Sequence, residues 1–178
     1  VPDCYADLGY RTVSTNPCGE IPLCPYDSCR LLAINLYSYV VNPFKPDAYF
    51  DFDLFKKHVA LAQRIMDDII DLELEKIERI MAKIDSDPEN EDVKHTESVL
   101  WQKIYKKSGQ GRRTGVGITA EGDMLAALGL RYGTEEATEF AEKVHQTVAL
   151  SAYRSSVEMA KDRGAYEEYD SAREKNNP

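Results

Sequence analysis

The sequence lacks several features that would place it in other protein classes. No apolar run approaches the roughly 20 residues of a membrane-spanning helix, and no basic-then-apolar leader comes before the body of the chain. Basic residues are fewer than acidic ones, 22 against 31, which gives a formal net charge of -9. Because general nucleic-acid binding depends on Lys and Arg neutralising phosphates, this balance argues against it. We expect a cytoplasmic protein with neither nucleic acid nor membrane as a partner.

Histidine is scarce, and the cysteines lack the spacing of a zinc site. The chain has three histidines and four cysteines, all four cysteines fall in the first 29 residues, and no two of them form a C-x2-C pair. We therefore expect no metal site. A disulfide framework suits small secreted domains, whereas clustered thiols in a reducing compartment are typical of redox or radical chemistry. Spacing alone does not decide between these alternatives. The cysteines are Cys4, Cys18, Cys24 and Cys29.

The strongest positive signal is the segment NPCGEIPL, which places an amide, a thiol and a carboxylate at alternate positions. In an extended segment, side chains two residues apart point the same way, so Asn16, Cys18 and Glu20 would face one substrate. Pro17 restricts the residue before it, and Gly19 permits a tight turn or close approach by a ligand. The triplet therefore predicts a site with a hydrogen-bonding amide, a reactive sulfur and a general base.

The rest of the chain is predicted to be mainly helical, with one short β segment near the N-terminus. Residues 29–41 form a buried strand that ends before Asn42, and Asp51 or Asp53 begins a long helix over 51–87. Residues 88–111 form a charged insertion with an acidic linker over 88–96 and a shorter helix from Thr96. Residues 112–165 contain a glycine turn, a helix over 120–128 and a last helix from Thr134 to Gly164.

Two details of these helices carry further expectations. The glycine-rich run from Gly109 to Gly117 matches neither nucleotide-binding glycine motif, so it predicts a close-packed turn rather than a phosphate loop. Apolar stripes over 66–84 and 140–152 are expected to bury each other. His145 lies at the edge of the second stripe without a paired Glu or Cys, which favours an ordinary histidine over a ligand.

Two segments of the sequence resemble one enzyme family. The N-x-C-x-E triplet within NPCGEIPL, followed by DSCRLLAINL, resembles the catalytic loop and following strand of ribonucleotide reductase large chains, most closely the adenosylcobalamin-dependent class. The block RRTGVGITAEGDMLAALGLRYGTEEATEFAEKV resembles that family's glycine turn and the helices after it. This resemblance implies that residues 1–178 are one fragment of a ten-stranded α/β barrel, with residues 14–41 as catalytic loop and following strand.

The resemblance also implies a reaction and its partners. Cys18, as a thiyl radical, would take the 3′ hydrogen of a ribonucleotide, Glu20 would be the base, and Asn16 would bind the ribose hydroxyls. Cys29 would be one of two reducing thiols. Adenosylcobalamin is the implied cofactor, with a di-iron radical subunit the less favoured radical source. The implied partners are the ribonucleotide, a thioredoxin-type reductant and the remainder of the barrel, and the resemblance leaves room for a homo-oligomer.

A second functional class accounts for the same residues differently. A helical protein-interaction module with a structural cysteine loop would use the long helix and the face around Val144 to bind a partner, since Asn, Pro and Gly together are common in ordinary turns. The alternation of three chemically useful side chains favours the enzyme. As a fragment, the chain is expected to be inactive alone, and the choice between di- and triphosphate substrates is open.

Overall fold

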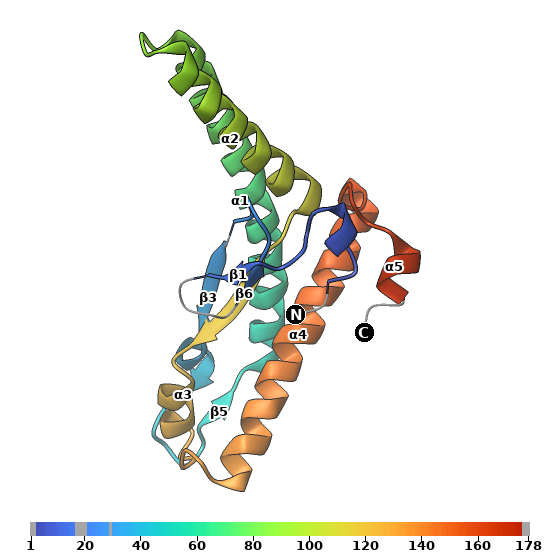
Figure 1. The fold of residues 1–178 in the computed structure, drawn as a ribbon. Helices are drawn as coiled ribbons and strands as arrows, with labels where there is room; N and C mark the ends of the chain where they lie inside the picture. Colours follow the sequence, from blue (N-terminus) through green and yellow to red (C-terminus); the bar gives the residue numbers. More distant parts are fainter. Residues whose placement is uncertain (1–2, 17–20, 29, 176–178) are drawn as a thin grey trace. The chain divides into compact units, whose positions relative to one another are not determined.

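The computed structural model describes residues 3–16, 21–28 and 30–175, and its helices and strands are drawn in Figure 1. The chain divides into two compact units, the first formed by residues 1–30, 67–115 and 165–178 and the second by residues 31–66 and 116–164. The described elements are η1 (Ala6–Leu8), β1 (Ser14–Thr15), β2 (Pro22–Leu23), β3 (Leu31–Asn35), η2 (Leu36–Tyr39), β4 (Val40–Val41), β5 (Tyr49–Phe50), α1 (Phe52–Ser86), α2 (Glu91–Gly111), β6 (Gly115–Thr119), α3 (Glu121–Ala127), α4 (Glu135–Arg163) and α5 (Ser171–Lys175).

The second unit begins with β3, which is shorter than the strand predicted over 29–41. It ends at Asn35, whose side chain accepts a hydrogen bond from the Tyr37 N–H at 3.0 Å and so caps the 3-10 helix η2. Local capping of this kind competes with continued strand pairing. The prediction of one continuous strand was therefore wrong. β3 instead pairs with β6, and β4 pairs antiparallel with β5 in a separate two-stranded sheet.

Aromatic side chains form the centre of the second unit. Phe55 on α1 is fully buried, and its ring lies 4.9 Å from that of Tyr39 and 5.2 Å from that of Phe50. The Asp51 side chain accepts from the Leu54 N–H at 2.9 Å, which confirms Asp51 as a cap of the long helix. Helix α4 packs on this core through one apolar face, formed by Ala137, Phe140, Val144, Val148 and Ala152.

The described packing partner of that face is the first part of α1. The face of α4 contacts Phe55, Val59 and Ala62 in the first part of α1, all members of one cluster. The predicted partner, the stripe over 66–84, falls almost entirely in the first unit, where Ile70, Ile77 and Ile84 are buried. The prediction that the two stripes bury each other stays a prediction, because periodicity identifies an apolar face and not its partner.

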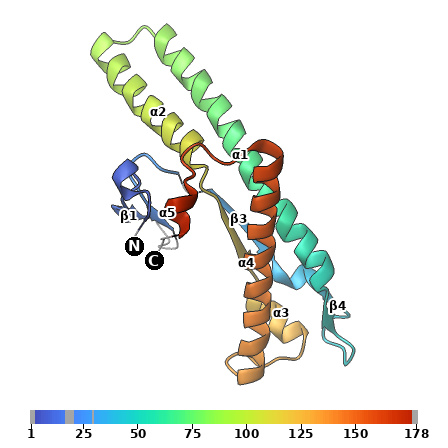
Figure 2. The same cartoon turned by 90° about the vertical axis from the view of Figure 1, so that its right-hand side faces the viewer.

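Two antiparallel helical segments, the second part of α1 and all of α2, form a hairpin in the first unit (Figures 1 and 2). The acidic linker predicted over 88–96 is largely helix, because the Asn90 side chain accepts from the Asp92 N–H at 2.8 Å and starts α2 at Glu91. The helix also continues past Gly109. It ends at Gly111, where Arg112 has φ 42° and donates its N–H to the Ser108 carbonyl. The predicted glycine turn is thus divided between this helix and strand β6.

The N-terminal segment of the first unit packs around Tyr10. Tyr10 is 1% exposed and belongs to a small cluster with Tyr5, Cys24 and Cys4. Its ring lies against the end of α2, because a Cβ placed on Gly111 would come within 2.9 Å of the ring. The Lys107 ammonium lies 3.6 Å from the ring centroid and adds a cation–π contact. A residue without a side chain at the end of α2 therefore makes room for a buried ring.

The described residues contain neither a membrane-spanning helix nor a closed barrel. None of their helices combines the length and the apolar character needed to cross a membrane. Within residues 3–16, 21–28 and 30–175 the strands form three separate two-stranded sheets and no closed barrel. The chain is mainly helical with short strands, as the composition and periodicity predicted.

The two glycines at the end of α2 give a matched test of this packing. Gly111→Ala would press a methyl group into the buried Tyr10 ring and should cost about 1–3 kcal/mol of unfolding free energy, as overpacking does. Gly109→Ala meets only Leu74 methyl groups at 3.7 and 3.8 Å, and should stabilise the helix by up to about 1 kcal/mol. Urea unfolding followed by circular dichroism measures both. Equal effects of the two substitutions would contradict the close approach of Tyr10.

Candidate functional site

A β-hairpin brackets the predicted catalytic triplet. Strands β1 and β2 pair antiparallel, with Ser14 opposite Leu23 and Thr15 opposite Pro22. The ladder extends outward through a hydrogen bond from the Val13 N–H to the Leu23 carbonyl at 3.0 Å. Toward the tip, the Asn16 N–H donates to the Ile21 carbonyl at 3.0 Å. The two residues next to the tip are therefore held together by the sheet.

Asn16 closes this hairpin with its side chain as well as its backbone. Its amide oxygen accepts from the Ile21 N–H at 2.8 Å, and the residue is only 3% exposed. An Asn side chain that bonds to a nearby backbone N–H stabilises a turn. The oxygen is thus used inside the loop, which leaves the NH2 group as the part of this amide suited to donate to a ligand.

The other predicted site residues lie outside the described part of the chain. Cys18 and Glu20 fall in the undescribed segment 17–20, between the two residues that close the hairpin. Cys29 is likewise not described, but its neighbours Ser28 and Arg30 are. The prediction that Asn16, Cys18 and Glu20 face a common space, and that Cys29 lies beside them, stays a prediction.

Arg30 is a buried cation that the sequence reasoning did not select. Its side chain is 5% exposed, and its guanidinium pairs with Glu73 on α1. On α2 it donates to the Ser108 hydroxyl at 2.7 Å, and it also donates to the Arg113 carbonyl at 3.0 Å. Its own carbonyl accepts from the Gly115 N–H at 3.1 Å. The only sequence signal for this role is a charged residue placed directly before the apolar run of β3.

A second buried charge lies two residues before Cys29. The Asp27 side chain is 2% exposed, accepts from the Ser28 N–H at 2.9 Å, and lies 3.7 Å from the Arg113 guanidinium. The Cys24 thiol donates to the same carboxylate at 3.5 Å. Arg113 also pairs with Asp3 at 2.7 Å, so it connects two acidic residues of the N-terminal segment. The described residues Cys24, Asp27 and Arg30 are therefore held by charge-assisted contacts.

The two described cysteines are kept as neutral thiols. Burial raises the pKa of the Cys24 thiol to about 11, and the negative charge of Asp27 adds to the shift. The pKa of Cys4 is also raised, first by desolvation and then by Glu174 and Asp3. A thiolate is the reactive form of cysteine in nucleophilic chemistry. These environments agree with the reading of Cys4 and Cys24 as ordinary free thiols.

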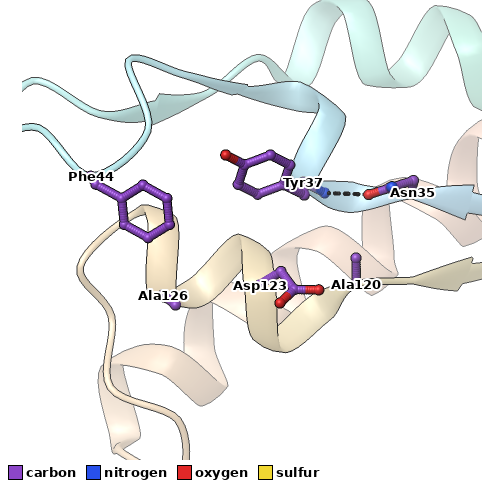
Figure 3. Close-up of a pocket in the computed structure, with 6 residues that line it drawn as sticks. All are labelled: Asn35, Tyr37, Phe44, Ala120, Asp123 and Ala126. Atoms are coloured by element: carbon purple, nitrogen blue, oxygen red, sulfur yellow. Dashed lines mark hydrogen bonds between the residues drawn. The ribbon is translucent and has the colours of Figure 1, made fainter.

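A hollow in the second unit is lined by the end of β3, the loop after β4 and helix α3 (Figure 3). Its volume is about 340 Å³, and its lining residues are Asn35, Tyr37, Phe44, Ala120, Asp123 and Ala126. The rings of Tyr37 and Phe44 lie 6.5 Å apart and form one side, whereas Asp123 supplies a carboxylate. A carboxylate repels phosphate, so this hollow does not suit the phosphates of a nucleotide.

The environment of His145 differs from the prediction in one respect. Its Nε2 lies 3.5 Å from the Glu121 carboxylate, although the sequence reasoning found no acidic partner. The partner was missed because Glu121 lies on α3 and the helical pattern was read within α4 alone. The histidine side chain is 57% exposed, so the contact is a surface pair. Among the described residues, no three His, Cys, Asp or Glu side chains gather closely enough to hold a metal ion.

Comparison with known proteins finds relatives that are named ribonucleoside-diphosphate reductases. A vitamin B12-dependent ribonucleoside-diphosphate reductase of Thermoplasma acidophilum is 34% identical over 153 residues, which cover 86% of this chain and 16% of the relative. An enzyme of the same name from Mycobacterium tuberculosis is 29% identical over 163 residues, covering 92% and 19%. The ribonucleoside-diphosphate reductase subunit alpha of Chlamydia pneumoniae is 28% identical over 159 residues, covering 87% and 12%.

The chain thus spans less than a fifth of the length of these relatives. The family model of the ribonucleotide reductase barrel domain matches residues 8–177. These residues include the β1–β2 hairpin, helices α1 and α2, and the long helix α4. Since this match covers nearly all of the sequence, the chain belongs to the ribonucleotide reductase barrel-domain family.

Proposed function

We propose that this chain is the part of a ribonucleotide reductase that carries the catalytic cysteine loop. The observation that carries the proposal is the hairpin closed by Asn16 and Ile21, because it brackets the N-x-C-x-E triplet inside a chain of this family. The hydrogen bonds hold Asn16 and Ile21, the described residues on either side of the proposed reacting groups, and catalysis requires groups held in place. The full-length enzyme would make deoxyribonucleotides.

The proposed chemistry starts at Cys18. Its thiyl radical takes the hydrogen atom from C3′ of the ribose, which leaves a thiol on Cys18 and a radical on C3′. The Glu20 carboxylate accepts the proton of the 3′-hydroxyl as water leaves C2′. A carboxylate serves here because it can hydrogen-bond the hydroxyl before the proton moves. At the end of the cycle, the hydrogen atom returns from Cys18 to C3′ and the proton returns from Glu20 to the 3′ oxygen. This restores the thiyl radical, the carboxylate and the 3′-hydroxyl.

Asn16 and Cys29 complete the proposed set. The Asn16 NH2 group would donate to the ribose hydroxyls, since its oxygen already accepts from Ile21. Cys29 and a second thiol outside residues 1–178 would supply two electrons and two protons, forming a disulfide as the C2′ position is reduced. A thioredoxin-type reductant would then reduce that disulfide. In the complete barrel, β3 and β6 would be two of ten strands.

The cofactor is proposed from the relatives. The Thermoplasma and Mycobacterium enzymes are named as vitamin B12-dependent, and we extend that dependence to the full-length protein. The hollow of about 340 Å³ does not fit adenosylcobalamin, because its volume is at the small end of sites for drug-sized ligands and a corrin is larger than those. No step above is therefore assigned to the cofactor. A di-iron radical subunit remains the less favoured source.

The interaction-module alternative is less well supported. It would explain the helical faces but not why the family match includes the hairpin and β6. The relatives named as diphosphate reductases favour a ribonucleoside diphosphate over a triphosphate as substrate. We further propose a cytoplasmic enzyme, in keeping with the formal charge of -9 and a need for reduced thiols.

Glu20→Gln tests the base in the full-length enzyme. Loss of a general base should lower kcat roughly 100- to 10,000-fold, while nucleotide affinity stays within about two-fold because the carboxylate acts on the reacting proton. Cys18→Ser is the inactive control, since an alcohol O–H bond is too strong for hydrogen-atom exchange. Deoxynucleotide formation and equilibrium nucleotide binding are the two measurements. Equal loss of binding and rate would mark Glu20 as a substrate clamp.

Two substitutions at Asn16 separate loop closure from substrate contact. Asn16→Ala leaves the Ile21 N–H without its acceptor and should cost about 1–3 kcal/mol of stability together with activity. Asn16→Asp keeps an acceptor for Ile21 but loses the NH2 donors, so thermal stability should stay near wild type while kcat falls. If the aspartate variant keeps full activity, the NH2 group has no part in binding ribose.

The isolated chain should form no deoxynucleotide, even with adenosylcobalamin, ribonucleotide and dithiol supplied together. One proposed reducing cysteine cannot form the intramolecular disulfide that two would form. Its helices should nevertheless fold, because Phe55 and Val144 belong to a core made within the chain. Product assays and circular dichroism test the two statements. Product above a no-protein control would overturn the need for the remaining chain.

A further inference from the structure

The hollow lined by the end of β3, the loop after β4 and helix α3 combines aromatic rings with a carboxylate. The rings of Tyr37 and Phe44 lie across the hollow from Asp123 on α3 (Figure 3). All of its lining residues belong to the second unit. The face of an aromatic ring carries negative charge density and attracts cations, and so does a carboxylate. The lining is therefore complementary to a positively charged group.

The Asp123 carboxylate is available to pair with such a group. Among the described residues, none forms a hydrogen bond or an ion pair with it. Glu121 lies in the same first turn of α3 and adds a second negative charge, although it already pairs with His145 at 3.5 Å. Ala120 and Ala126 contribute only methyl groups to the lining. Such small side chains leave room for a ligand between the rings and the carboxylate.

Phe44 is held at the hollow at a conformational cost. Its φ is 62°, in the left-handed region that bulky residues rarely adopt, and the residue is 70% exposed. The Phe44 N–H donates to the Ala127 carbonyl at 2.8 Å, which fixes the loop to the helix that carries Asp123. Strained residues persist where surrounding contacts enforce them, and they cluster at ligand sites. An exposed ring adds little to the core, so its fixed position points to a ligand.

The hollow suits a guanidinium better than other cations. Its volume of about 340 Å³ is near the lower limit for small-molecule sites, which suits one long side chain. A planar guanidinium can stack on an aromatic ring while its N–H groups donate to a carboxylate. Asn35 offers a donor as well, because its side-chain oxygen accepts from the Tyr37 N–H and its NH2 group remains. A backbone carbonyl beside an arginine would accept from that group.

We infer that this hollow is a docking site for an arginine side chain of a partner protein. The guanidinium lies between the rings of Tyr37 and Phe44 and the Asp123 carboxylate. A carbonyl of the same partner segment accepts from the Asn35 NH2 group. The formal charge of -9 favours a basic partner segment. The inference is independent of the reductase chemistry proposed above, because none of these residues belongs to the proposed reacting set.

The test uses the full-length enzyme and two peptides that differ in one charge. The probes are an acetylated and amidated glycine–arginine–glycine peptide and the same peptide with citrulline, which has the shape of arginine without its charge. Saturation-transfer difference NMR titrations should give a Kd on the order of 1 mM for the arginine peptide. The citrulline peptide should bind at least about three-fold more weakly, as loss of an exposed ion pair and a cation–π contact requires.

Two substitutions assign the binding to the hollow, and each has a matched control. Asp123→Asn should weaken binding of the arginine peptide at least about three-fold, whereas Glu139→Gln, which removes an exposed carboxylate of α4, should leave it unchanged. Phe44→Gly removes the ring and relieves the strained φ, so the fold is kept while binding falls by a similar factor. Its control is Tyr132→Ala, which removes a residue that is 78% exposed and lies outside the lining.

Each outcome of these titrations decides for or against the inference. Arginine-selective binding that falls in both Asp123→Asn and Phe44→Gly, and stays in the two controls, supports it. Equal binding of the arginine and citrulline peptides would overturn it, because charge would then have no part in recognition. Full retention of binding in either Asp123→Asn or Phe44→Gly would also overturn it. So would the absence of binding by either peptide, as when the remainder of the polypeptide covers the hollow.

Discussion

The first unit depends on one buried cation. Arg30 replaces its lost hydration with a carboxylate, a hydroxyl and a carbonyl, drawn from α1, α2 and the residue before Thr114. The buried Ser108 hydroxyl would lose this partner without the guanidinium, and the guanidinium would be unpaired without its three acceptors. A network of this type tolerates few alternative arrangements. It therefore makes the position of residue 30 a consequence of how the two long helices pair.

The same reasoning shows what the charged insertion contributes to the first unit. Residues 88–111 look like a solvent-exposed addition when their composition is read alone. In the structure, α2 supplies Ser108 to Arg30, the Lys107 ammonium to the Tyr10 ring, and the glycine that gives this ring its space. The insertion thus holds the N-terminal segment from one side. In its acidic first turn, the Asn90 side chain caps the helix and the Glu91 carboxylate lies 3.5 Å from the Lys94 ammonium.

The cysteines illustrate how environment separates residues of one type. Cys24 is buried beside Asp27, and both desolvation and the negative charge keep its proton in place. Cys18 lies outside the described residues, two positions after Asn16 in the sequence. Residue identity alone does not give Cys24 this character. Burial contributes most to the raised pKa of Cys24, and Asp27, three positions away in the sequence, adds to it.

The sequence by itself determined the triplet Asn16, Cys18 and Glu20, the family, and the amphipathic helices. The alternation of functional side chains, the residues of a motif and helical periodicity are all local properties of the sequence. Local capping was also readable, as Asp51 and Thr134 show at the starts of α1 and α4. Tertiary structure alone decided the packing partner of α4, the early end of β3 and the contacts of Arg30. These depend on pairings between residues far apart in the chain or on competition between local bonds, and neither has a fixed spacing in the sequence.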